Sequence, residues 1–128
     1  WDGAGAGGGA ARRRARGRVR QAEANGAGLV RARCLLRKGD RDAGIALLED
    51  IRESPKGGRD DEEAWYAATK ILGELYLDEL NRPDLAVAAF KDYKGYLKAG
   101  ADTHYQLGRA YEAAGDAANA VREYDAVT

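Results

Sequence analysis

The stretch HYQLGRAYEAAGDAANAVREYDAV, residues 104–127, decides the fold of this chain. It has the composition of two helices separated by a break at Gly115 and Asp116. Gly108 nevertheless lies in the middle of the first helix, where a glycine costs about 1 kcal/mol relative to alanine. Such a cost is tolerated where a helix must pass very close to a neighbour, so the stretch predicts a tightly crossed helix pair.

The same pattern occurs once more, earlier in the chain. Residues 71–76 read ILGELY and residues 106–111 read QLGRAY, so both contain Leu-Gly-x-x-Tyr. Each is followed by Ala-x-x-x-aromatic, which is Ala86 and Phe90 in one copy and Ala120 and Tyr124 in the other. The two copies are offset by 35 residues, close to the 34-residue period of one class of helical repeat.

On these residues the chain resembles the tetratricopeptide repeat family over 66–128. A weaker third copy fits AGLVRARCLLRKGDRDAGIALLEDI, residues 27–51, with Ala32 at the position of Gly108 and Leu48 at that of Tyr124. The resemblance implies an all-α fold, an α-solenoid of antiparallel helix pairs with about three repeats. No stretch alternates apolar and polar residues as a strand does.

The sequence predicts five segments. Residues 1–24 are a Gly-rich and Arg-rich arm, partly flexible or helical, and residues 25–58 are a degenerate helix pair. Residues 59–65 are a linker and helix start. Repeats follow at 66–100 and 101–128, and the sequence allows the last repeat to be a truncated one.

Three of the breaks between helices combine glycine with aspartate: KGD at 38–40, KAGAD at 98–102 and AGDAA at 114–118. Glycine readily adopts the left-handed conformation that ends a helix, and aspartate caps the next one. Each break is therefore expected to be a glycine stop followed by an aspartate cap.

Charge is unevenly distributed, although the formal net charge is zero. Residues 1–58 contain 13 Lys or Arg against 7 Asp or Glu, and residues 59–128 contain 8 against 14. This separation of basic and acidic residues is more informative about binding partners than the net charge of zero.

The sequence predicts no enzyme activity, no metal and no cofactor. Cys34 and His104 are the only cysteine and histidine, and the repeat alignment places them two repeats apart, too far for a nucleophile pair. Both are expected to be packing residues. The acidic run DDEE at 60–63 fits a helix start, with Asp60 and Glu63 at capping-box spacing.

The family resemblance implies a protein-interaction module whose first helices line a concave face. The candidate lining residues are Leu29, Arg33, Lys70, Glu74, Leu77, Asp102, Tyr105, Arg109 and Glu112. Some members of the family clamp a C-terminal carboxylate with lysine, asparagine and arginine side chains. Lys70 matches the lysine of this clamp, but Glu74 stands at the position of the asparagine, so the clamp is not reproduced here.

The alternative function is binding of an anionic polymer or membrane surface by the arginine-rich arm. Its residues are Arg12, Arg13, Arg14, Arg16, Arg18 and Arg20. Such a density neutralises several phosphates and gives salt-dependent affinity. No aromatic residue lies between the arginines to stack on bases, so nucleic acid is the less favoured partner, and an acidic surface of a neighbouring chain also fits.

Self-association is expected from the last helix. Ala120, Val121, Tyr124 and Val127 form an apolar stripe with no following repeat or polar capping helix to cover it. Either the natural chain continues or a second molecule covers the stripe, with the acidic half of one copy against the basic half of another.

The start at Trp1 and the lack of methionine suggest a piece of a longer product. The single cysteine slightly favours a cytoplasmic location, without excluding a periplasmic or secreted one.

Overall fold

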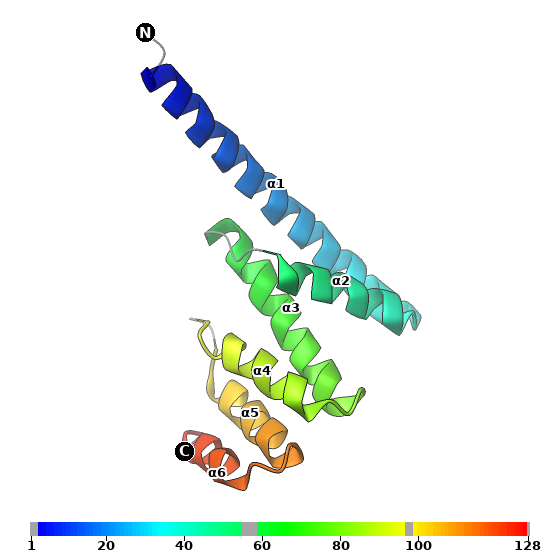
Figure 1. Cartoon of the computed structure of the whole chain (residues 1–128). Coiled ribbons are helices and arrows are strands. Elements are labelled where there is room, and N and C mark those ends of the chain that lie inside the picture. The colour runs from blue at the N-terminus through cyan, green and yellow to red at the C-terminus, as the bar shows by residue number, and fades with distance from the viewer. Residues whose placement is uncertain (1–2, 55–58, 97–98, 128) are drawn as a thin grey trace. The chain divides into compact units, whose positions relative to one another are not determined.

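The computed structural model describes residues 3–54, 59–96 and 99–127, apart from the side chains of 3–8, 15, 18, 19, 21, 22 and 59–61. These residues form six α-helices and no strand (Figure 1). The helices are α1 (Gly3–Lys38), α2 (Arg41–Glu53), α3 (Arg59–Asp78), α4 (Pro83–Tyr93), α5 (Ala101–Ala113) and α6 (Ala117–Asp125). The prediction of an all-α helical repeat is confirmed.

The chain divides into two compact units, Trp1–Trp65 and Tyr66–Thr128. Helix α3 begins in the first unit and ends in the second. The finer division into five segments stays a prediction.

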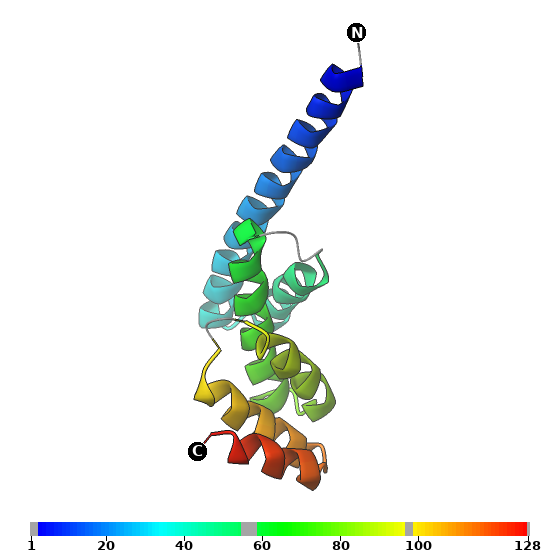
Figure 2. The same ribbon diagram turned by 90° about the vertical axis from the view of Figure 1, so that its left-hand side faces the viewer.

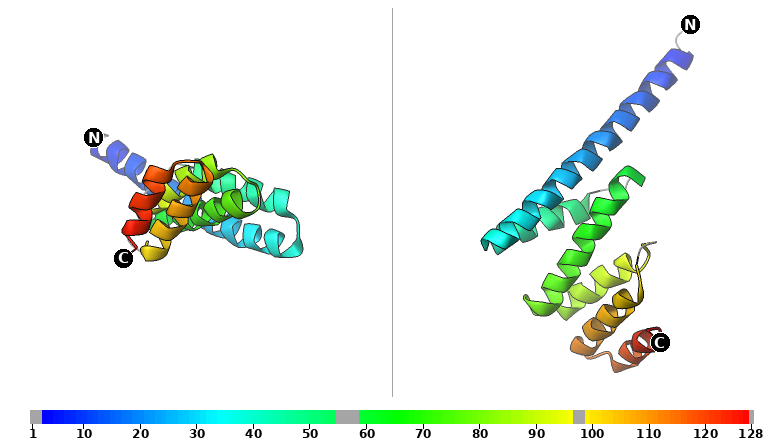
Figure 3. Two further views of the ribbon diagram at one scale, coloured as in Figure 1. Left: turned by 90° about the horizontal axis from the view of Figure 1, so that it is seen from below. Right: turned by 180° about the vertical axis from the view of Figure 1, so that it is seen from behind.

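In the first unit, α2 runs back along the C-terminal part of α1 (Figure 3). Ala32 and Leu48 are fully buried between them. A Cβ placed on Gly44 would lie 3.2 Å from the carbonyl oxygen of Ala32 and 3.0 Å from the Leu36 side chain. The degenerate copy is therefore a closely crossed pair as well, but here the glycine comes from the second helix.

Helix α1 extends far beyond α2 toward the N-terminus (Figures 1 and 2). It has 36 residues and α2 has 13. The pair closes where the Asn25 side-chain amide donates to the Ser54 hydroxyl over 3.1 Å. Residues 9–24 of α1, which precede this contact, include the arginine-rich segment.

The second unit contains two crossed pairs, α3 with α4 and α5 with α6. A Cβ on Gly73 would lie 2.9 Å from the Phe90 ring, and one on Gly108 would lie 2.6 Å from the Tyr124 ring. Real Cβ atoms do not approach other atoms so closely, so both positions require glycine. The predicted reason for Gly108 is confirmed, and α4 packs on α5 to join the two pairs into a short solenoid.

Two of the three breaks have the expected glycine stop, and one of them also has the expected aspartate cap. Gly39 and Gly115 have φ of +95° and +84°, and the Asp116 carboxylate accepts a hydrogen bond from the Asn119 backbone N–H over 3.2 Å. The third prediction is wrong: Gly100 precedes α5 as its N-cap with φ −120°, and Asp102 lies within the first turn.

Other local expectations have mixed outcomes. Asp40 occupies the N-cap of α2 without a side-chain hydrogen bond. The proposed cap at Asp60 lies outside the described side chains. Cys34 is exposed, which corrects its interpretation as a core residue, because the core side of α1 is taken by Leu29 and Ala32. In the described part of the chain, no helix is both long and apolar enough to cross a bilayer.

Candidate partner-binding face

The second unit brings most of the predicted lining residues together on α3 and α5. We call this surface the α3–α5 face. It comprises Lys70, Glu74, Leu77 and Asp78 of α3 and Asp102, Tyr105, Arg109 and Glu112 of α5. Asp102, Tyr105 and Glu112 are exposed and the other predicted members are half-buried, so the face is open to a partner.

An ion pair joins the two helices across this face. Arg109 Nη2 lies 3.0 Å from Asp78 Oδ1, and Arg109 Nη1 donates to Gln106 Oε1 over 2.8 Å. Asp78 was missed in the sequence, although it lies four residues after Glu74, on the same side of a helix. The guanidinium is thus held in place by one residue from each helix.

Glu74 is surrounded by more negative than positive charge. Burial raises the pKa of its carboxyl above the usual value of 4.5, Lys70 lowers it, and Asp102 and Asp78 raise it further. Together these effects raise the pKa of Glu74. The carboxylates of α3 and α5 therefore repel one another, and a cation placed between them would relieve that repulsion.

Two members of the face, Lys70 and Tyr105, lie beside aromatic rings. Lys70 Nζ lies 5.6 Å from the centre of the Tyr93 ring, within the range of a cation–π contact. Tyr105 is 48% exposed, and its ring centre lies 6.0 Å from that of Tyr124. The Tyr124 hydroxyl donates to Glu112 Oε1 over 3.2 Å, so the exposed ring of Tyr105 has a fixed neighbour.

The first unit contributes differently from expectation. Leu29 is buried in the core, only 9% exposed, which corrects its placement on a concave face. Arg33 is exposed on α1. Of the arginine-rich arm, Arg12, Arg13, Arg14, Arg16 and Arg20 are exposed, whereas Arg18 falls outside the described side chains.

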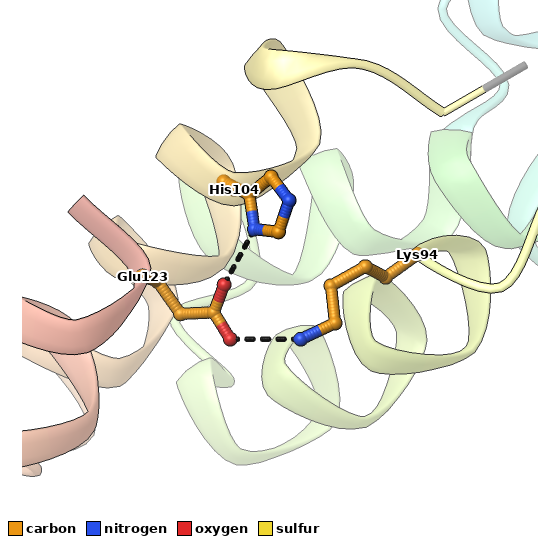
Figure 4. Close-up of polar contacts among 3 residues, drawn as sticks. All are labelled: Lys94, His104 and Glu123. Carbon is orange, nitrogen blue, oxygen red and sulfur yellow. Dashed lines mark hydrogen bonds and ion pairs between the residues drawn. The ribbon is translucent and has the colours of Figure 1, made fainter. Parts of the chain in front are cut away.

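Glu123 of α6 contacts His104 of α5 and Lys94, the residue that caps the end of α4 (Figure 4). Its side chain is only 10% exposed. Lys94 Nζ lies 2.9 Å from Oε1, and His104 Nδ1 lies 2.8 Å from Oε2. The prediction of a packing role for His104 did not include this contact, in which its ring pairs with a buried carboxylate.

The Glu123 cluster predicts a stability that depends on acid pH. Burial alone would raise the pKa of Glu123, but the hydrogen bonds from His104 and Lys94 outweigh burial and hold the pKa below its usual 4.5. A carboxyl with a depressed native pKa stabilises the fold above the unfolded pKa, and loses this contribution as pH falls through the native value. Glu123→Gln is expected to lower the unfolding free energy by about 1–3 kcal/mol at neutral pH, and the difference from the parent should shrink below pH 4.5.

Urea unfolding across pH measures this difference. Glu112→Gln, at an exposed glutamate that accepts one hydrogen bond, is the control and should change stability by less than about 0.5 kcal/mol. A Glu123→Gln effect that persisted undiminished in acid would show that the carboxylate is not its source.

Cys34 and His104 are the residues considered for a nucleophile pair in this chain. Cys34 and His104 belong to different units, and no group of three His, Cys, Asp or Glu in the described part of the chain is arranged to hold a metal ion. The α3–α5 face presents carboxylates, two cations and an exposed aromatic ring, which are groups suited to binding a polar segment of protein.

Comparison with known proteins agrees with this geometry over the last helix pair. Residues 102–128 match a family model described as a tetratricopeptide repeat, so the resemblance is confirmed there. No match was found among curated proteins or solved structures. Repeats of this family are generally non-catalytic and typically take part in protein–protein interaction.

Proposed function

We propose that the chain is a non-catalytic interaction module that binds a peptide segment of a partner protein on the α3–α5 face. One observation carries this proposal. Seven of the predicted lining residues lie on α3 and α5, and each of these is the first helix of a tetratricopeptide-like pair. Because the guanidinium of Arg109 is already tied to Asp78, the face is organised before a partner arrives, which lowers the entropy lost on binding.

The charges of the face favour a basic segment. Four carboxylates, those of Glu74, Asp78, Asp102 and Glu112, stand against Lys70 and Arg109. Lys70 already contacts a tyrosine ring and Arg109 an aspartate. Tyr105 adds an exposed ring that can receive an arginine or an apolar side chain. The proposed ligand is therefore a lysine- or arginine-rich peptide.

Selection from a displayed peptide library on the 128-residue chain tests this proposal. The selected peptides are expected to be basic, and the variant Glu74→Lys, Asp102→Lys should bind them about tenfold more weakly or worse, because attraction becomes repulsion. Fluorescence anisotropy of a labelled selected peptide measures the loss.

The matched control is Asp84→Lys, Asp92→Lys. Both aspartates are exposed on α4, so the control changes the net charge equally without altering the face. If the control weakened binding as much as the face variant, binding would depend on overall charge and the proposed site would be wrong.

Of the self-association stripe predicted on α6, only part remains available to a second copy. Ala120 is buried and Tyr124 covers Gly108, so half of the predicted stripe is used inside the pair. Val121 and Val127 remain 57% and 40% exposed. These two valines are the part of the stripe that a second copy can cover.

A further inference from the structure

Helix α1 is strongly basic in two segments, residues 12–20 and 31–38. It contains ten arginines and lysines and a single acidic residue, Glu23. The described arginines before Asn25 are exposed, whereas the apolar residues that bind α2 follow it. We call residues 9–24 the arm.

None of the arm side chains that the structure describes is buried against another element. A helix in a folded protein gains most of its stability from packing an apolar face, and a helix that is polar on all sides needs another source of support. Arg12, Arg13 and Arg14 lie about 100° apart around the helix axis, and these three and Arg16 are all exposed. Such an exposed basic surface is suited to contact with an acidic partner.

We infer that the arm of one copy docks on the α3–α5 face of a second copy, so that the chain assembles head to tail. This inference rests on the proposed function, because it names the basic segment that the α3–α5 face takes. The two surfaces are complementary in charge: residues 66–128 contain 10 acidic and 7 basic residues, and the arm contains six arginines and Glu23.

The dimensions of the two surfaces also agree. Residues 12–20 of a helix span about 12 Å. Glu74 and Asp78 lie one turn apart on α3, and Asp102 of the adjacent α5 is close enough to raise the pKa of Glu74. Packed helices lie about 8–10 Å apart, so an arm laid across α3 and α5 meets carboxylates of both.

The contact is heterologous, because it joins two different surfaces. Every bound copy still offers a free arm or a free face, so growth continues into rings or filaments instead of stopping at a dimer. Exposed ion pairs are screened by salt. The average mass is therefore expected to rise above 13.8 kDa with concentration at low salt, and to return to it at high salt.

Light scattering on three forms of the full chain tests the arm. The arm variant replaces Arg12, Arg13, Arg14 and Arg16 with glutamine, which keeps helix propensity. The control replaces Arg31, Arg33, Arg37 and Lys38 with glutamine, removing the same charge from the same helix. At low salt the parent and the control should assemble and the arm variant should stay monomeric.

Mixing provides the sharper measurement. The variant Glu74→Lys, Asp102→Lys keeps an intact arm, and the arm variant keeps an intact face. Each alone should be monomeric, whereas an equimolar mixture should give a complex of two chains that grows no further. A mixture that remained monomeric would overturn the head-to-tail contact.

Other outcomes also decide the matter. A monomeric parent at low salt would overturn the inference. Assembly that survives in the arm variant but is lost in Val121→Asp would also overturn it, because the contact would then lie on α6. If the parent stayed monomeric but bound a duplex DNA oligonucleotide through the arm, the partner would be nucleic acid. Basic peptides selected on the face in any of these cases would uphold the proposed function while the inference failed.

Discussion

Replacing Gly108 with leucine is expected to lower the unfolding free energy by about 3 kcal/mol. The Cβ alone would lie 2.6 Å from a ring carbon of Tyr124, so α5 and α6 must separate or the ring must leave its site. Either movement exposes Leu107 and Ala120, which are now buried. Thermal or urea unfolding of the variant measures the loss.

The control is a glycine in the interior of another helix. A Cβ on Gly26 meets no atom within 4 Å, so Gly26→Ala should stabilise the chain by up to about 1 kcal/mol through helix propensity. The same propensity gain at Gly108 should be overwhelmed by the clash. Gly108→Ala is therefore expected to change sign in a Tyr124→Ala background, and a sign that did not change would show that Tyr124 is not the obstacle.

Replacing Phe90 with alanine is expected to have the largest effect, about 3–5 kcal/mol. Phe90 is 1% exposed, and its ring lies directly against the backbone of Gly73. Because a glycine has no side chain to move into the vacated space, the cavity collapses poorly and the lost contacts are not replaced. Urea unfolding monitored by circular dichroism reports the change.

Val121→Ala serves as the control for Phe90→Ala. Val121 is 57% exposed on α6, so its truncation should change stability by about 0.5 kcal/mol or less. A Phe90→Ala variant as stable as Val121→Ala would mean that the α3–α4 crossing does not depend on this ring.

Much of the fold could be predicted because it is encoded locally. Leu72 and Leu107, offset by 35 residues, are both fully buried, and the glycine beside each lies under an aromatic ring of the following helix. Helical periodicity and the repeat period together specify which residues face the neighbouring helix. The same reasoning failed at Cys34 and Gly100, where the sequence lacks a clear signal for which side of the helix is covered or which residue begins it.

The lining residues were predicted from their positions in the repeat, but their interactions were not. Asp78 was missed, although it pairs with Arg109 across α3 and α5. The pKa of Glu74 is raised mainly by burial and further by Asp102, a residue of another helix. Positions in the repeat predict which residues lie on the face. The electrostatics of those residues depend on how α3 and α5 are packed beside each other.

The sequence by itself determined the helix pairs, their close crossings and the separation of basic and acidic residues, because each depends on local pattern and composition. Only the tertiary structure decided the polar contacts. Lys94 and His104 reach Glu123 over separations of 29 and 19 residues, and Arg109 reaches Asp78 over 31. Such contacts depend on the rotation and offset of packed helices, which are fixed by the whole set of core side chains and not by any single stretch of sequence.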